Sequence, residues 1–322
     1  MMEIDDLASL VALTDVDGIG DKRALELYRA VETSEELWSR PLAAFDDFHY
    51  VDEETHAQLR ELPETIDDYR EQFDRYRNDG IEVIGIDDDR YPAALRRNHA
   101  PLILYARGNV DLLDDPAVSV SGSRETNEAG RQWIREIACE LAAEGYTIVS
   151  GGARGSDTAA HEGTLDATGE TIVVLGTGVD TPYPEENEAL FSDIVDAGGL
   201  LLSHRPPDAG PTRHSFLNRN PTISALSSGT IVVATDGTGG TMAQYDIAVE
   251  QNRRVFVPEA NRDIQPDNGL RELRTAEATT VVSSTASIEA GLLEAVPGDE
   301  TEPSDTNGSE EQANQTCLDD WG

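Results

Sequence analysis

Short apolar runs alternate with longer amphipathic stretches through most of the chain from residue 117 onward. The apolar runs are continuous, which is typical of parallel strands covered by helices on both faces. They predict strands at 117–122, 146–151, 170–176, 199–204, 229–235, 254–259 and 279–284. Because helical stretches connect these strands, for example 124–145 ended by Gly145, the pattern predicts a doubly wound, mostly parallel α/β sheet with right-handed crossovers.

The N-terminal part has a helical periodicity instead. Residues 7–31 contain two apolar-periodic stretches around a glycine-containing turn at 16–20. This is a helix-hairpin-helix pattern. It is compatible both with binding of a nucleic-acid phosphate and with a purely structural turn. Helical character continues to residue 62, so 1–62 is predicted to be a small helical domain. A helix at 64–79 and a strand at 81–86 then open a second domain, 63–290.

The last stretch of the sequence, 291–322, has a different composition. It is rich in Glu, Asp, Pro, Ser, Asn, Gly and Gln, and no basic residue follows Arg274. Such a segment cannot bury enough apolar surface to offset the entropy lost on ordering. We therefore expect it to be a disordered acidic tail.

The chain is strongly acidic, with 24 Lys+Arg against 63 Asp+Glu and a formal net charge of −39. Acidic residues occur in every segment, and Lys22 is the one lysine. Molar salt shortens the Debye length to about 3 Å and screens such repulsion, so the composition favours a salt-loving source. The net charge is therefore explained by solubility and does not exclude nucleic acid as a ligand.

Several protein classes are disfavoured by simple features of the sequence. No stretch approaches the roughly 18 apolar residues of a membrane span, and the acidic N-terminus does not resemble a signal peptide. We therefore expect a cytoplasmic protein. Cys139 and Cys317 lie far apart, so neither a disulfide framework nor a metal site is predicted.

Glycine-rich loops follow four of the predicted strands, at 121–124, 151–157, 176–178 and 237–241. The carboxyl ends of parallel strands meet at one edge of a sheet, where ligands of such folds bind. Free amides there suit a phosphate, and glycine allows its close approach. The loops thus favour a phosphate-rich ligand, although turn chemistry alone is the competing interpretation.

The type of phosphate ligand is narrowed by what the loops lack. No G-x-G-x-x-G fingerprint of a dinucleotide site opens a helix, and no Walker lysine is present. A mononucleotide or a nucleic-acid strand remains. Residues 211–220 add Arg213, Phe216 and Arg219, and a positive groove with an aromatic ring is typical of single-strand binding. A core role for Phe216 stays open. A second basic stretch, 90–110, is compatible with a set of buried or paired arginines.

The motifs occur in the order found in one known family. The chain resembles the DNA-processing protein A (DprA/Smf) family, in a form like that of salt-loving archaea, over about 80–287. The resemblance rests on YP-x-x-L (91–95), LYARGN (104–109), VSGSR (120–124), VSGGARGSDTAAH (149–161), VLGTGVDTPYPEEN (174–187) and F-x-x-RN (216–220).

This resemblance implies both a fold and a function. It implies an extended Rossmann-like domain preceded by a small helical domain of the helix-hairpin-helix or SAM type. The implied activity is binding and protecting single-stranded DNA and loading a RecA/RadA-type recombinase, as in natural transformation. A homodimer is implied, with no catalysis and no cofactor.

The resemblance also assigns residues to the DNA site. The candidates for DNA contact are Ser121, Gly122, Ser123, Arg124, Gly151, Gly152, Ala153, Arg154, Gly155, Asn187, Arg219, Asn220, Gly239, Gly240 and Thr241. The sequence departs from the family pattern at Pro221, where an arginine is usual, at Ala234, where an acid is usual, and at 239–241. A winged-helix-like C-terminal domain is not expected.

Two other functions are compatible with the same fold superfamily. The loop at 237–241 resembles that of nucleotide phosphoribohydrolases, which carry P-G-G-x-G-T-x-x-E. Here Asp236 replaces the proline and Gln244 the glutamate, and an amide cannot act as the acid or base. A nucleotide-sensing module is the third hypothesis.

Overall fold

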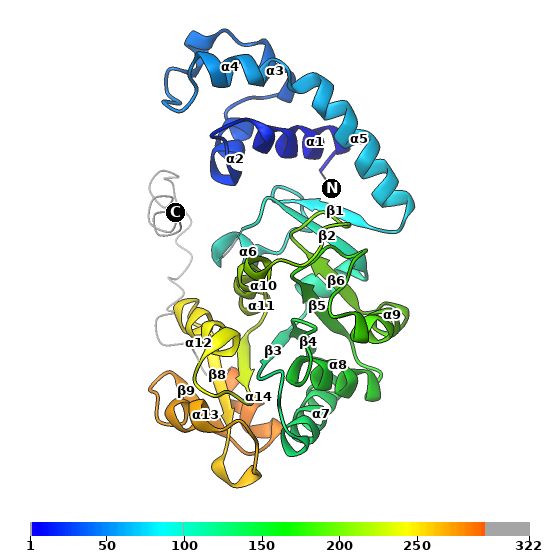
Figure 1. Ribbon diagram of the computed structural model, residues 1–322, viewed down its shortest axis with the longest axis vertical. Coiled ribbons are helices and arrows are strands. Elements are labelled where there is room, and N and C mark those ends of the chain that lie inside the picture. Colours follow the sequence, from blue (N-terminus) through cyan, green and yellow to red (C-terminus); the bar gives the residue numbers. More distant parts are fainter. Residues whose placement is uncertain (1, 99, 294–322) are drawn as a thin grey trace, which may run out of the picture.

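The computed structural model describes residues 2–98 and 100–293. A helical region at one end of the molecule leads into a large α/β region (Figure 1). The helical region consists of α1 (Ile4–Ala12), η1 (Leu13–Asp15), α2 (Asp21–Arg29), α3 (Ser34–Ser39), η2 (Leu42–Phe45), α4 (Glu53–Leu59) and α5 (Leu62–Asn78). Gly80, at φ +74, follows α5. Glycine adopts this left-handed conformation without the strain of a side chain, so the helix ends there.

Nine strands of the described residues form one sheet, in the order β1-β2-β6-β5-β4-β3-β7-β8-β9. The strands are β1 (Glu82–Gly85), β2 (Ile103–Gly108), β3 (Ala117–Ser121), β4 (Thr147–Ser150), β5 (Thr171–Leu175), β6 (Leu200–Ser203), β7 (Gly229–Val232), β8 (Arg254–Pro258) and β9 (Thr279–Val282). β2 pairs antiparallel with both β1 and β6, and the other pairs are parallel. The strand order reverses between β3 and β7, so the ligand crevice of such folds is expected at their carboxyl ends.

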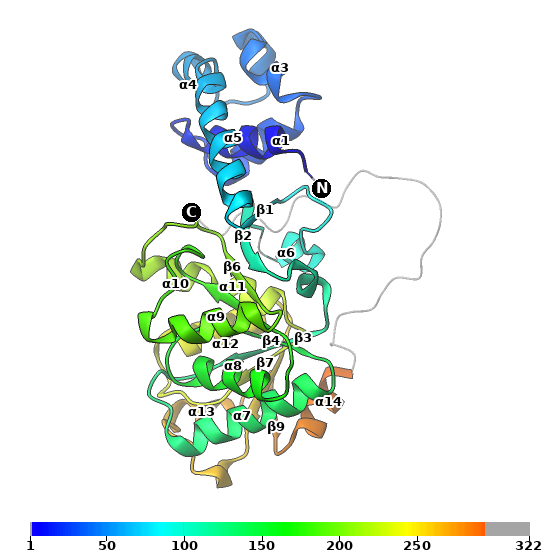
Figure 2. The ribbon, with the colours of Figure 1, turned by 90° about the vertical axis from the view of Figure 1, so that its right-hand side faces the viewer.

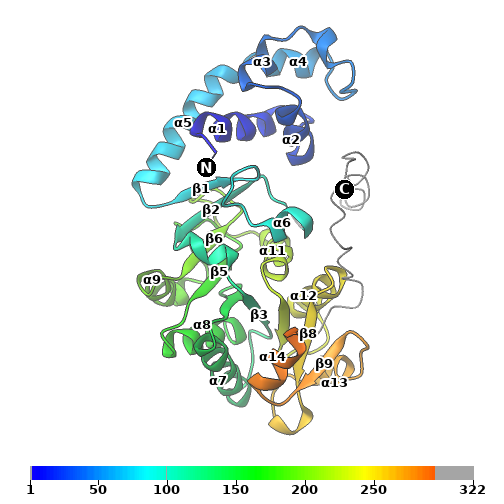
Figure 3. The same cartoon turned by 180° about the vertical axis from the view of Figure 1, so that it is seen from behind.

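The remaining helices cover both faces of this sheet. They are α6 (Ala93–Asn98), α7 (Glu128–Ala143), α8 (Ser156–Asp166), α9 (Glu188–Asp196), α10 (Arg213–Asn218), α11 (Asn220–Ala225), α12 (Gly239–Glu250), α13 (Asn268–Leu273) and α14 (Thr285–Leu293), with the short turns η3 (Val110–Asp114), η4 (Glu185–Asn187) and η5 (Ala260–Arg262). Helices α7, α8 and α9 lie on one face (Figure 2), and α11 and α12 lie on the other (Figure 3). This is the arrangement that right-handed crossovers produce when the strand order reverses.

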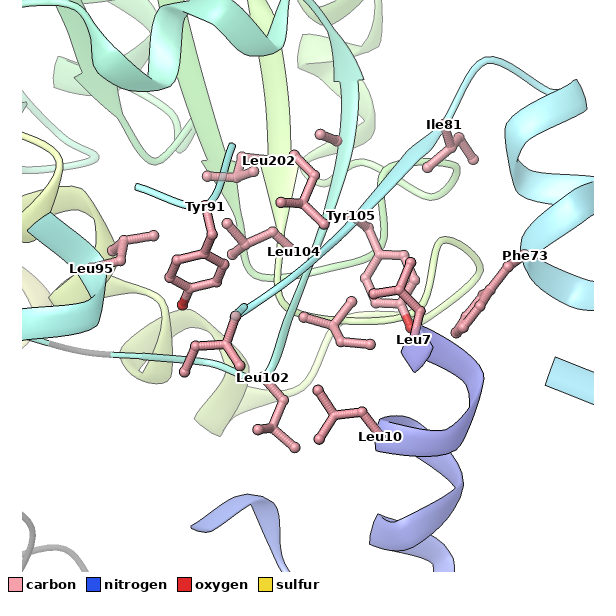
Figure 4. Close-up of a cluster of buried hydrophobic side chains, with 14 of the residues drawn as sticks. Leu7, Leu10, Phe73, Ile81, Tyr91, Leu95, Leu102, Leu104, Tyr105 and Leu202 are labelled. Atoms are coloured by element: carbon pink, nitrogen blue, oxygen red, sulfur yellow. The ribbon is translucent and has the colours of Figure 1, made fainter. Parts of the chain in front are cut away.

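A continuous apolar core joins the helical region to the sheet. Leu7 and Leu10 of α1 belong to the same buried cluster as Leu104 and Tyr105 of β2, and Figure 4 shows their side chains facing one another. A second cluster, which includes Val232 of β7, lies at the other end of the sheet. The helical region therefore packs on the sheet edge through burial of apolar surface.

Polar contacts reinforce this packing. The amide of Met2 donates to a carboxylate oxygen of Asp88 at 2.9 Å, and Arg29 pairs with Asp87 at 2.5 Å. Burial would raise the pKa of Asp88, but hydrogen bonds from Arg90 and from the amides of Arg90 and Met2 outweigh it and hold the pKa at about 2. Asp88 therefore stays charged although its side chain is fully buried.

The structure confirms the mixed α/β fold and the mostly parallel sheet. All eight predicted strands are present, with ends that differ by at most three residues. β2 was not predicted, because residues 90–110 were interpreted as a basic stretch. Helices α6, α10 and α11 were not predicted either. Each has six residues, and two turns are too short to show a helical period.

The N-terminal hairpin is present as a turn between η1 and α2. Gly18 adopts φ +80, and its carbonyl accepts a hydrogen bond from Arg23 at 2.6 Å. The Asp17 amide donates to Gln58 at 2.9 Å, so part of the hairpin backbone is used within the protein. A DNA contact at this hairpin stays a prediction.

Two further expectations concern the C-terminal tail and a membrane-spanning helix. The expected tail falls, from residue 294 on, outside the described residues, while 291–293 complete α14. Among residues 2–98 and 100–293, no helix combines the length and apolar character needed to cross a membrane.

Candidate nucleic-acid interface

The loops after β3 and β4 are locked together at the carboxyl edge of the sheet. The Ser123 amide donates to the Ala234 carbonyl at 2.8 Å, and the Ser156 amide donates to the Ser123 carbonyl at 3.2 Å. Gly155 has φ +76, and a Cβ there would lie 2.5 Å from the Arg124 carbonyl oxygen. Glycine is therefore required at 155 for the two loops to meet.

Beside these loops lies a small depression with an unusual concentration of positive charge. It is lined by Arg124, Gly151, Ala153, Arg154, Tyr183, Pro184, Phe216 and Arg219. The rings of Tyr183 and Phe216 have their centroids 5.7 Å apart. Three guanidinium groups and two aromatic rings thus meet at one place on the sheet edge.

Arg219 contributes to this depression from below its surface. The residue is only 8% exposed, and its Nη2 donates to the Gly151 carbonyl at 3.3 Å. A Cβ on Gly151 would lie within 2 Å of the guanidinium, so glycine makes room for the arginine. Burial lowers the pKa of Arg219 to about 10; nearby Asp157 opposes this shift and Arg124 adds to it. Arg219 is still charged at neutral pH.

Two further ionisable side chains, both of α8, are buried. Asp157 accepts a hydrogen bond from the Ala153 amide at 3.1 Å, and burial raises its pKa although the charge of Arg219 opposes this. His161 is hydrogen-bonded through Nδ1 to the Thr171 hydroxyl at 2.8 Å. Burial, with a smaller contribution from Arg219, lowers the pKa of His161 to about 3, so this imidazole is neutral.

The other two arginines of the depression are exposed but differ in their partners. Arg154 forms a two-pronged ion pair with Glu186: its Nε donates to one carboxylate oxygen and its Nη2 to the other, at 2.6 Å. Arg124 makes no ion pair within the part of the chain that the structure describes. Arg124 is therefore the more readily available charge for an anion.

Some candidate residues support the loops and are buried or half-buried. Asn187 is buried and donates to the Gly152 carbonyl at 3.0 Å and to the Thr158 hydroxyl at 2.9 Å. Gly122 leaves no room for a Cβ, which would lie 2.3 Å from the Ser156 hydroxyl. Asn220 is also buried, at the start of α11. These residues shape the site.

The last group of candidates lies away from the depression. Gly239, Gly240 and Thr241 form the first turn of α12, which follows β7. They are not among the residues that line the depression. A Cβ on Gly239 or Gly240 would meet no atom within 4 Å, so this turn is open to solvent.

The basic stretch at 90–110 is largely structural. Arg90 pairs with Glu82 and Asp88, Arg96 donates to the backbone carbonyls of Ile86 and Asp88, and Arg107 pairs with Asp180. The interpretation as paired arginines is therefore confirmed for Arg90 and Arg107, whereas Arg96 is exposed and donates to carbonyl groups.

Sequence reasoning missed Tyr183 and Glu186 as members of the site. Both lie in the stretch 174–187 that carries the family motif, but spacing alone did not show that they reach the loop 151–155. Phe216, left open between core and site, is half-buried and lines the depression.

Fold and site together define a class of protein: a doubly wound α/β protein with an arginine- and aromatic-lined depression at the carboxyl edge of its sheet. The family model for DNA recombination-mediator protein A matches residues 82–291. The chain therefore belongs to this DNA recombination-mediator (DprA/Smf) family.

Individual relatives agree with this assignment. Protein Smf of Synechocystis is 32% identical over 283 residues, covering 85% of this chain and 69% of that protein. DNA processing protein DprA of Streptococcus pneumoniae is 39% identical over 170 residues, which is 52% of this chain and 60% of that protein. The alignments thus span about three fifths to two thirds of these relatives.

Two solved structures share the architecture. DNA processing protein A of Streptococcus pneumoniae aligns with a TM-score of 0.70 and 28% identity, covering 90% of this chain and 98% of that one. The Helicobacter pylori protein, which binds single-stranded DNA, aligns with a TM-score of 0.58 and 29% identity over 66% of this chain and 95% of that one.

Proposed function

We propose that this protein binds single-stranded DNA at the depression formed by Arg124, Arg154, Arg219, Tyr183 and Phe216. The observation that carries the proposal is the meeting of three guanidinium groups with two aromatic rings. Guanidinium groups suit phosphates, and an aromatic ring stacks on a base for about 1–3 kcal/mol. A duplex hides its base faces, so the combination favours a single strand.

The family relationship supports the same function. The Helicobacter pylori relative binds single-stranded DNA, and the family model describes recombination mediators. By extension, we propose that the protein protects incoming single strands and loads a RecA/RadA-type recombinase during DNA processing in natural transformation. We further propose that it acts in the cytoplasm of a salt-loving cell, as a homodimer and without catalysis.

The direct test compares a labelled oligothymidylate with a duplex of the same length in equilibrium binding across a salt series. We expect the single strand to bind more tightly. Arg124→Ala should weaken its binding roughly tenfold, because a hydrogen bond to a charged group contributes about 1.5 kcal/mol or more. The slope of log affinity against log salt should fall by about 0.7, as expected for one lost phosphate contact.

The matched control is Arg70→Ala. Arg70 is a half-exposed, ion-paired arginine of α5, which lies in the helical region away from the depression. Its loss removes the same charge and should leave DNA binding nearly unchanged. Equal effects of the two substitutions, or equal binding of single and double strands, would contradict the proposed site.

The enzymatic alternative makes a different prediction. In α12, Gln244 stands where the phosphoribohydrolase motif has glutamate, and it is 2% exposed. We therefore expect no base release when the protein is incubated with AMP and the products are separated. Hydrolysis would favour the enzyme, and binding of a mononucleotide alone would favour the sensing module.

A further inference from the structure

Arg154, in the loop after β4, already binds a carboxylate of the protein, that of Glu186. Arg154 and Glu186 have side chains that are 47% and 53% exposed. Their two-pronged contact fills the guanidinium edge formed by Nε and Nη2. A carboxylate and a phosphate present the same pair of oxygens to this edge, so both cannot occupy it at once.

We propose that Glu186 occupies on Arg154 the place that a DNA phosphate takes, so that strand binding requires exchange of the carboxylate for the phosphate. Glu186 is thus an affinity-determining residue for single-stranded DNA. This inference rests on the proposed function of the depression.

The position of Glu186 is fixed by its neighbour. Glu186 lies in η4, and the next residue, Asn187, donates to the Gly152 carbonyl at 3.0 Å. Gly152 belongs to the same loop as Arg154. The backbone of Glu186 is therefore tied to the loop that carries its partner, and the ion pair is placed before any ligand arrives.

The exposure of the pair makes exchange feasible. Exposed ion pairs are weak, because water and salt screen both charges, so a ligand with several contacts can displace the carboxylate. A strand that also engages Arg124 and the rings of Tyr183 and Phe216 has such contacts. A free inorganic phosphate lacks the ring contacts and competes less well for Arg154. Glu186 thereby disfavours small anions relative to a polynucleotide.

The neighbouring glutamate provides a matched control. Glu185 is also exposed and lies in η4. Glu185→Gln removes the same charge at nearly the same place but leaves the Arg154–Glu186 pair intact. Any difference between Glu185→Gln and Glu186→Gln therefore reports the release of Arg154 and not a general loss of negative charge.

The experiment measures oligothymidylate binding by the full chain and its variants across a salt series, with thermal melts to verify folding. We expect Glu186→Gln to bind about 3- to 10-fold more tightly at low salt, the scale of one unit-charge interaction near 4 Å in water. Its log–log salt slope should steepen, because salt weakens the competing Arg154–Glu186 pair of the parent, whereas no such pair opposes binding in the variant. Glu185→Gln should change affinity less than about twofold, because it leaves the Arg154–Glu186 contact in place and an exposed charge contributes little by itself.

A double variant completes the test. In an Arg154→Ala background, Glu186→Gln should give no gain beyond that of Glu185→Gln, since no guanidinium is left to release. Weaker binding by Glu186→Gln would show that the carboxylate orients Arg154 for DNA, and binding equal to Glu185→Gln would show no exchange; either result overturns the inference alone. If the parent protein does not bind the strand at all, the proposed function and this inference fall together.

Discussion

At the residue scale, the site distributes three arginines among three environments. Arg219 is buried and hydrogen-bonded to the loop after β4, Arg154 is ion-paired, and Arg124 is exposed. Their presence near a phosphate site could be predicted from the motifs and the family resemblance. Which arginine is buried, ion-paired or exposed could not be predicted. The burial of Arg219 depends on how α10 packs against the loop, and Glu186, the partner of Arg154, comes from a distant segment.

The buried imidazole of His161 leads to a pH prediction. Its folded pKa of about 3 lies below the ordinary value of 6.5, so below pH 6.5 the unfolded chain binds a proton that the folded protein excludes. The free energy of unfolding should therefore decrease by up to about 1.4 kcal/mol for each unit of pH from 6.5 toward 4.5. Urea denaturation at a series of pH values measures this slope.

The matching variants isolate the contribution of His161. His161→Gln should flatten the slope over that range even if it lowers overall stability. His49→Gln, which removes an exposed imidazole, should leave the slope of the parent. A slope that persists in His161→Gln would assign the effect to other groups.

At the scale of elements, the site depends on two loops that are held together by hydrogen bonds. The Ser123 carbonyl accepts from both the amide and the hydroxyl of Ser156, at 3.2 and 3.1 Å. The loop after β3 carries Arg124, and the loop after β4 carries Arg154. Fixing one loop on the other therefore fixes the spacing of two charges, and Gly155 stands at the point of contact.

Gly155→Ala should disturb both stability and DNA binding. Its backbone lies at φ +76, ψ −110, and the added Cβ would lie 2.5 Å from the Arg124 carbonyl oxygen. We expect a loss of at least about 2 kcal/mol in the free energy of unfolding, from backbone strain and overpacking. Urea denaturation and oligothymidylate titration of the same preparation measure the two effects.

Gly210→Ala is the control for this substitution. A Cβ at Gly210 meets no atom within 4 Å, and its φ lies outside the positive range. It should be nearly neutral in both measurements. A Gly155→Ala protein as stable as the parent would show that the loops can separate without cost, and that glycine is not needed there.

The element scale also shows what the sequence can and cannot predict. The strands from β3 to β9 are long enough apolar runs to be predicted, and their alternation with helices predicts the doubly wound sheet. Strand β1 was predicted as well, but β2 and its antiparallel pairing with β1 and β6 were not. Local patterns do not encode these long-range pairings. The same limit explains why Tyr183 was not placed beside Phe216.

At the scale of the whole molecule, a positive site operates on a strongly negative protein. The full chain has a formal net charge of −39, yet the depression contains three guanidinium groups. At physiological ionic strength the Debye length is about 8 Å, so distant acids are screened and nearby ones dominate. This is why one carboxylate at position 186 can matter more to DNA than the many acids of the remaining surface.

The same charge governs the proposed homodimer. Two subunits of net charge −39 repel each other at low salt, whereas about 1 M salt reduces the Debye length to about 3 Å and removes most of that repulsion. We therefore predict a salt-dependent monomer–dimer equilibrium, with the dimer favoured above about 1 M. Light scattering at fixed protein concentration across a salt series measures the average mass directly.

An osmolyte series separates screening from a general gain in apolar burial. Sucrose strengthens effective burial but does not screen charge, so it should promote the dimer much less than salt does if repulsion is the main barrier. A protein that stays monomeric from about 0.2 to about 3 M salt, a range over which screening becomes nearly complete, would contradict the dimer. It would also weaken the case for recombinase loading, because two linked sites hold one strand at a high effective concentration that a single site lacks.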